Sequence, residues 1–129
     1  MSQWITVCPI ADILPATGVC ALIGTQQVAI FRPYADERLF AISNIDPFAQ
    51  ASVLSRGLIA EHQGELWVAS PLKKQHFRLH DGFCLEDETR SVASFASRVV
   101  DGLVQVAAKQ SFAPHPNPLP KGEGAVQST

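Results

Sequence analysis

The chain has 129 residues, of which 47% are hydrophobic and 17% charged, and its formal net charge is −2. This composition is typical of one folded domain and excludes a chain that is disordered throughout. The mildly acidic balance argues against nucleic acid as the main partner, and no apolar run reaches the roughly 18 residues that a membrane-spanning helix needs.

The cysteine count and the first residues indicate the compartment. The chain has three cysteines, an odd number with no close pair, so the sequence predicts no disulfide framework. The start, Met1-Ser2-Gln3-Trp4, lacks the basic and apolar segments of a secretory signal. We therefore expect a cytoplasmic protein whose thiols stay reduced.

Residues 1–108 are expected to form one domain of short strands separated by turn residues. The predicted strands are Trp4–Cys8, Gly18–Ile23, Gln27–Arg32, Arg38–Ser43, Leu58–Glu61, Glu65–Ala69, His76–Leu79, Arg98–Val100 and Leu103–Ala107. The predicted turns between them include His62-Gln63-Gly64, Asp81-Gly82 and Asp101-Gly102. Only single helical turns are expected, at Asp12–Leu14, Ser52–Arg56 and Val92–Phe95. This pattern predicts an all-β fold, an antiparallel barrel or sandwich.

The composition changes at Lys109. Residues 109–129 carry four alternating prolines, Pro114, Pro116, Pro118 and Pro120, which prevent a helix and remove donors from a sheet. We expect this segment to be a disordered Pro/Gly-rich tail, and the sequence assigns it no role.

The usual reactive groups of enzymes form no recognisable site in this sequence. Cys8, Cys20 and Cys84 lie in or beside predicted strands, and Cys20, between Val19 and Ala21, is expected to face a core. The histidine and cysteine spacing matches no zinc pattern, and no phosphate-binding glycine loop is present. The sequence therefore predicts no catalytic residues.

Two loops carry the most informative pattern. Asn44-Ile45-Asp46-Pro47-Phe48 follows a predicted strand, and Ser70-Pro71-Leu72-Lys73-Lys74 precedes another. This layout resembles a Rieske-type iron–sulfur domain, in which loops of the form N-x-C-P-H and C-P-x-H-G hold a [2Fe–2S] cluster through two Cys and two His. The four ligand positions correspond here to Asp46, Phe48, Ser70 and Lys73.

None of these four positions keeps its ligand. A phenyl ring has no donor atom, and a lysine ammonium must lose a proton before it can bind a metal. Asp46 and Ser70 offer hard oxygen ligands, which suit this cluster poorly. We therefore predict a Rieske-like fold without an iron–sulfur cluster or other metal.

A Rieske-like domain without its ligands resembles the small subunit of the cytoplasmic NAD(P)H-dependent nitrite reductase of bacteria. The resemblance runs from Ser2 to about Ala107 and is most specific at Val19–Tyr34, Phe40–Phe48 and Ser52–Lys74. It implies a large-subunit partner that carries FAD, an iron–sulfur cluster and sirohaem and reduces nitrite to ammonium. The small subunit of that family is needed for activity but has no active site or cofactor of its own.

The degenerate loops supply the candidate contacts with this partner, because loop tips of Rieske domains face their electron-transfer partners. The candidate contact residues are Asp46, Phe48, Lys73, Lys74 and Gln75. Phe48 has two interpretations, an anchor at the interface or a side chain folded inward to fill the space of a cluster.

Two other functions remain open from the sequence. The chain could be a Rieske-type electron-transfer ferredoxin, or a stand-alone binding or regulatory module on a degenerate Rieske scaffold. The stoichiometry with a large subunit, the docking face and the choice between NADH and NADPH are also left open.

Overall fold

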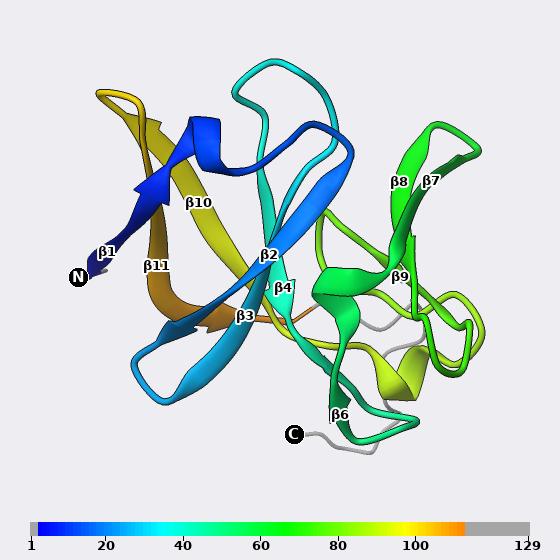
Figure 1. Ribbon diagram of the computed structural model, residues 1–129. Coiled ribbons are helices and arrows are strands. Elements are labelled where there is room, and N and C mark those ends of the chain that lie inside the picture. Colours follow the sequence, from blue (N-terminus) through cyan, green and yellow to red (C-terminus); the bar gives the residue numbers. More distant parts are fainter. Residues whose placement is uncertain (1–2, 113–129) are drawn as a thin grey trace.

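The computed structural model describes residues 3–112 and contains eleven strands and three short 3₁₀ turns (Figure 1). Six strands form the larger sheet in the order β1-β11-β10-β4-β3-β2, all antiparallel. They are β1 (Trp4–Pro9), β2 (Thr17–Ile23), β3 (Gln26–Arg32), β4 (Phe40–Ser43), β10 (Ser94–Val100) and β11 (Leu103–Ser111). Figure 1 shows this sheet curling on itself, which agrees with the predicted all-β fold.

A smaller layer lies beside this sheet and contains the two loops of interest. A three-stranded sheet is formed by β7 (Leu58–His62), β8 (Glu65–Ala69) and β9 (His76–Arg78), and a two-stranded ribbon by β5 (Ile45–Asp46) and β6 (Ala51–Ser52). The 3₁₀ turns are η1 (Ile10–Asp12), η2 (Leu54–Arg56) and η3 (Glu88–Arg90). Within the described range, no helix is long and apolar enough to cross a membrane.

Strand β3 joins the two parts because both of its faces are buried. Val28 and Ile30 point into the core enclosed by the curled sheet. Ala29 and Phe31 point the other way, into a second core shared with Val68 and other residues of the smaller layer. This double burial explains the continuous apolar run in β3, where a strand with one exposed face would alternate. The second core supports the two loops.

The two-residue hairpin turns form where the sequence predicts them. Gln63-Gly64 joins β7 to β8, and Asp101-Gly102 joins β10 to β11. All four residues have positive φ angles of 53°, 79°, 52° and 76°. This conformation matches the twist of antiparallel strands, and glycine at the second position adopts it without steric cost.

Several predicted boundaries are wrong. The helical turn expected at Val92–Phe95 is absent, because Ser94 and Phe95 already belong to β10 and Phe95 pairs with Ala41. Strand β4 begins at Phe40, since the Arg38 amide donates to the Asp36 carboxylate in a preceding bend. Strand β11, predicted as Leu103–Ala107, continues to Ser111. The prolines of the predicted tail lie outside the described residues.

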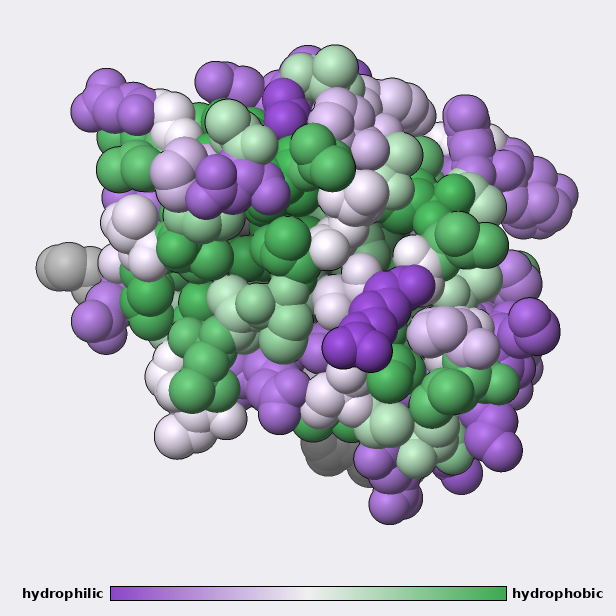
Figure 2. Space-filling view, in the orientation of Figure 1, coloured by the Kyte–Doolittle hydropathy of each residue, from purple (hydrophilic) through white to green (hydrophobic). Residues whose placement is uncertain are grey.

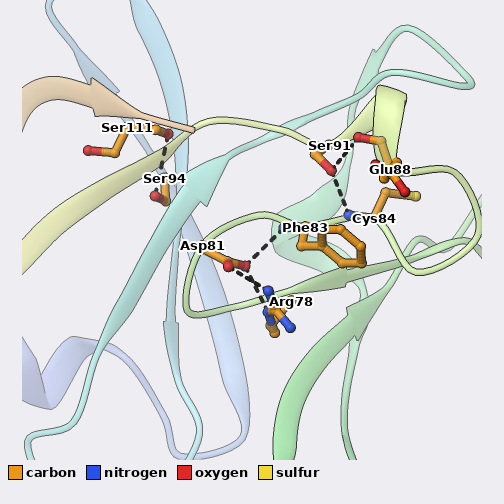
Figure 3. A network of polar contacts seen from close by, with 8 residues as sticks. All are labelled: Arg78, Asp81, Phe83, Cys84, Glu88, Ser91, Ser94 and Ser111. Carbon is orange, nitrogen blue, oxygen red and sulfur yellow. Dashed lines mark hydrogen bonds and ion pairs between the residues drawn. The ribbon is translucent and has the colours of Figure 1, made fainter. Parts of the chain in front are cut away.

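Polar contacts fix the long connection between β9 and β10 (Figure 3). Arg78 donates two hydrogen bonds to Asp81, at 2.9 and 2.6 Å, and the Phe83 amide donates a third at 3.1 Å. Burial of Asp81 would raise its pKa, but these hydrogen bonds and the Arg78 charge outweigh it, so the pKa is lowered. Farther along, Ser91 Oγ accepts from the Cys84 amide at 2.9 Å. The connection is therefore held in one conformation.

Gly82 allows the first part of this connection to lie close to its last part, at Val92. Its φ is +79°, and a Cβ added there would lie 2.1 Å from the Val92 carbonyl oxygen.

We expect Gly82→Ala to lower the free energy of unfolding by about 2–4 kcal/mol, from strain and overpacking together. Urea denaturation measures this loss. Gly64→Ala is the control, because Gly64 has the same φ but no atom within 4 Å of an added Cβ. Equal losses of unfolding free energy in both variants would show that the close approach of residue 82 to Val92 does not require glycine.

Candidate functional site

The two loops meet at a buried hydrogen bond between Asp46 and Ser70. Asp46 ends β5 and Ser70 follows β8, and the hydroxyl of Ser70 donates to Oδ2 of Asp46. The two side chains are 0% and 1% exposed. The other carboxylate oxygen, Oδ1, accepts from the amides of Phe48 at 2.8 Å and Ala49 at 3.3 Å. One carboxylate thus holds the first loop and attaches it to the second.

Asn44 fixes the start of the first loop. It is 2% exposed, and its Oδ1 accepts from the Ser55 amide at 2.7 Å. Its main-chain carbonyl accepts from the Leu54 amide at 3.0 Å, and its Nδ2 donates to the Cys20 sulfur at 3.3 Å. A buried amide is stable only when its polar atoms are paired in this way. Asn44 therefore ties the first loop to both η2 and β2.

Phe48 packs mainly inward. Its ring is half-buried against the second core, with its centroid 6.3 Å from that of Phe77. Arg90 from η3 lies over the ring at 5.3 Å and donates to the Pro47 carbonyl at 3.2 Å. The geometry favours the inward packing of Phe48, while the guanidinium of Arg90 covers the ring from outside.

The second loop presents its side chains outward from a tight turn. The Ser70 amide donates to the Gln75 carbonyl at 2.9 Å, and the Lys74 amide donates to the Ser70 carbonyl at 3.0 Å. Lys74 has a φ of 66°, a left-handed conformation that is uncommon for a residue other than glycine. Leu72, Lys73 and Lys74 are exposed. Gln75 is half-buried, and its Oε1 has no hydrogen-bond partner within residues 3–112.

The arrangement does not fit the [2Fe–2S] cluster of Rieske domains. Asp46 and Ser70 are bonded to each other, so neither offers a free donor atom. Phe48 contributes a ring that is packed against Phe77, and Lys73 projects toward solvent. Cluster binding requires thiolate and imidazole ligands, which none of these positions supplies. Over the described residues, no other group of His, Cys, Asp and Glu has a metal-binding arrangement.

The structure corrects two expectations and adds residues that the sequence did not single out. Asp46 is fully buried and cannot contact a partner, because it serves the inter-loop hydrogen bond. Cys20 is exposed, since the alternation of β2 turns Val19 and Ala21 toward the core instead. The role of Arg90 depends on a contact across 43 sequence positions, which no local pattern reveals.

His76 and Glu86 form a further pair beside the second loop. Oε1 of Glu86 accepts from the His76 amide at 2.8 Å, and Oε2 lies 2.7 Å from Nδ1 of the imidazole. Burial of Glu86 would raise its pKa, but the hydrogen bonds from His76 outweigh it, so the pKa is lowered. Glu86 therefore fixes the start of β9.

Comparison with known proteins agrees with this geometry. Residues 3–107 match the family of Rieske-like [2Fe-2S] domains. The nitrite reductase (NADH) small subunit of Escherichia coli strain K12 is 71% identical over 106 residues, which cover 82% of this chain and 98% of that protein. The chain belongs to the family of nitrite reductase (NADH) small subunits. An NMR structure of the E. coli protein NirD superposes with a TM-score of 0.79 at 70% identity, covering 83% of this chain and 97% of that one.

Two more distant similarities extend the comparison. A segment of the nitrite reductase [NAD(P)H] large subunit of Klebsiella oxytoca is 36% identical over 110 residues, which cover 85% of this chain but 11% of that protein. The ferredoxin of carbazole 1,9a-dioxygenase from Nocardioides aromaticivorans has a TM-score of 0.72 at 23% identity, covering 84% of this chain and all of the other. The latter similarity shows the fold alone. This chain therefore shares its fold with that ferredoxin.

Removing the Ser70 hydroxyl tests the inter-loop hydrogen bond. We expect Ser70→Ala to lower the free energy of unfolding by about 1–3 kcal/mol, because the buried Asp46 carboxylate loses a donor that no water replaces. Chemical denaturation measures this loss. In the control Ser94→Ala, the lost contact is a long one of 3.4 Å at the exposed end of β10, so the change should stay within about 0.5 kcal/mol. A loss no larger at Ser70 than at Ser94 would contradict a structural role for the bond.

Proposed function

We propose that this chain acts as the cofactor-free small subunit of a cytoplasmic NADH-dependent nitrite reductase and works by binding the large subunit. The observation that carries the proposal is the replacement of a cluster site by the Asp46–Ser70 hydrogen bond, in a chain 71% identical to a nitrite reductase (NADH) small subunit. A domain without ligands for an iron–sulfur cluster cannot transfer electrons through these two loops. Its contribution to an oxidoreductase is then structural.

The similarity to part of a large subunit supports direct association of the two proteins. In Klebsiella oxytoca, a segment related to this chain lies within the same polypeptide as the large subunit. Two functions that share one polypeptide in one organism commonly act as one assembly. The same comparison favours one small subunit for each large subunit.

The large subunit supplies the redox chemistry in this proposal. The family resemblance assigns FAD, an iron–sulfur cluster and sirohaem to it, which together carry electrons from NADH to nitrite and yield ammonium. The residues of this chain contribute binding surface and shape. In this proposal, none of its side chains acts as a catalytic acid, base or nucleophile.

The surface formed by the two loops is the proposed docking face. Its exposed residues are Ile45, Leu72, Lys73, Lys74 and Arg90, with Gln75 and Phe48 partly covered. The combination of apolar side chains and cations suits an interface with a mixed apolar and acidic surface. Phe48 supports this face from below through its packing on Phe77.

Reconstitution with the large subunit tests the proposed function. We expect anaerobic, nitrite-dependent oxidation of NADH by the cofactor-loaded large subunit to increase strongly when the full chain is added. The chain itself, purified without oxygen, should contain no iron at the stoichiometry of a cluster. Serum albumin at equal concentration is the control for non-specific stabilisation.

Either of two results would contradict this function. Activity that does not depend on the added chain would favour a stand-alone binding module. Iron at cluster stoichiometry, with the electron paramagnetic resonance spectrum of a reduced Rieske centre, would favour the ferredoxin function.

A further inference from the structure

A hollow of about 410 Å³ opens beside the second loop, on the outer face of the β7-β8-β9 sheet. Its walls come from η2, from the first residue of β7, from the turn after β8 and from β9. The residues that line it include Arg56, Leu58, Ala69, Pro71, Lys74 and His76. Ser70 lines the same hollow, so the hydrogen bond to Asp46 also fixes one of its walls.

One residue that lines the hollow, Leu58, is apolar and mostly exposed. Leu58 is 78% exposed, the highest value for any large hydrophobic side chain in the described part of the chain. It pairs with Ala69 across β7 and β8, and both side chains lie on the face opposite to Ile59, which packs on the second core. Covering this leucine with a partner would remove its apolar surface from water, which would favour binding.

Gly57 fixes the position of Leu58 at the edge of the hollow. A Cβ at residue 57 would lie 2.3 Å from the Ala69 carbonyl oxygen, so only glycine permits the approach of this segment to β8. The chain therefore turns from η2 into β7 at a fixed point, and Leu58 and Arg56 extend from either side of it.

Two cations stand at the rim without counter-charges. Neither Arg56 nor Lys74 has an ion pair or side-chain hydrogen bond with any other residue from 3 to 112. In contrast, Arg38 and Arg78 are each paired with an aspartate. Lys74 is also held in its left-handed turn by the Ser70 carbonyl. The unpaired charges favour an occupant that brings a carboxylate.

The shape favours a stretch of polypeptide over a small anion. A second hollow of about 300 Å³ borders the first, and His76 lines both. The other residues that line it are Ala60, Glu61, His62, Trp67 and Leu85. In Figure 2, hydrophobic surface lies over the part of the molecule where Figure 1 shows η2, β7 and β8, with strongly hydrophilic surface between the apolar patches. An apolar side chain followed by an acidic one would match this pattern.

We infer that this hollow receives a segment of the large subunit in which an apolar side chain covers Leu58 and a neighbouring carboxylate lies between Arg56 and Lys74. The inference rests on the proposed function and extends the docking face from the loop tips onto the outer face of the smaller sheet. It assigns Arg56 and Leu58 to the interface, two residues that the loop pattern does not include.

The test compares the affinity of full-length variants for the cofactor-loaded large subunit. Leu58→Ser, Arg56→Gln and Lys74→Gly should each weaken binding about tenfold or more, as expected for central interface residues. Lys74→Gly removes the charge and keeps a residue that favours the positive φ, so the turn is preserved. The controls are Leu22→Ser, at a side chain 68% exposed on β2, and Lys109→Gln, at an exposed cation of β11. Both should bind within about twofold of the unmodified chain.

The possible failures are distinguishable. An unmodified chain that does not bind the large subunit would overturn the proposed function and the inference together. Normal binding by all three variants would overturn the inference alone. Weaker binding by the charge variants with no effect of Leu58→Ser would also contradict it, because such a site would accept a free anion such as nitrite instead of an apolar segment. Thermal unfolding of each variant shows that the fold is retained.

Discussion

The hydrogen bond between Ser70 and Asp46 is the interaction on which the functional end of the molecule depends. In a Rieske domain the cluster itself joins the two loops, but here a buried hydroxyl and a buried carboxylate do so. Such a pair is stable only because each oxygen has its partners: Asp46 also accepts two backbone amides, and Ser70 Oγ accepts from the Leu72 amide at 3.3 Å. The loops thus keep their places without a metal.

This substitution changes what the end of the molecule can do. The atoms that would bind iron are satisfied internally, and the Phe48 ring is packed between Phe77 and Arg90. What remains outside is a surface of exposed aliphatic side chains and of cations that have no ion pair within residues 3–112. In the proposed function, the fold contributes this surface to an assembly and does not transfer electrons through the two loops. Because the chain belongs to the nitrite reductase (NADH) small-subunit family, the partner proposed for this surface is the large subunit.

The sequence predicted the fold well where local chemistry decides it. Alternating apolar residues and the Gln63-Gly64 and Asp101-Gly102 turns located most strands, and the two loops with absent ligands indicated the family. Contacts between distant segments could not be predicted. The burial of Asp46 depends on Ser70 from the loop after β8, and the covering of Phe48 depends on Arg90. The exposure of Leu58 depends on which face of β7 packs on the second core, and the sequence does not show this.

Hydrogen–deuterium exchange of the full chain, alone and bound to the cofactor-loaded large subunit, tests most directly whether this end is the docking face. The account predicts that binding slows exchange at residues 45–49, 70–76 and 56–60 together. The β10–β11 turn at Asp101-Gly102, in the other part of the fold, should exchange at the same rate in both states. Slower exchange at that turn or along β2, with no change at the two loops, would contradict the account.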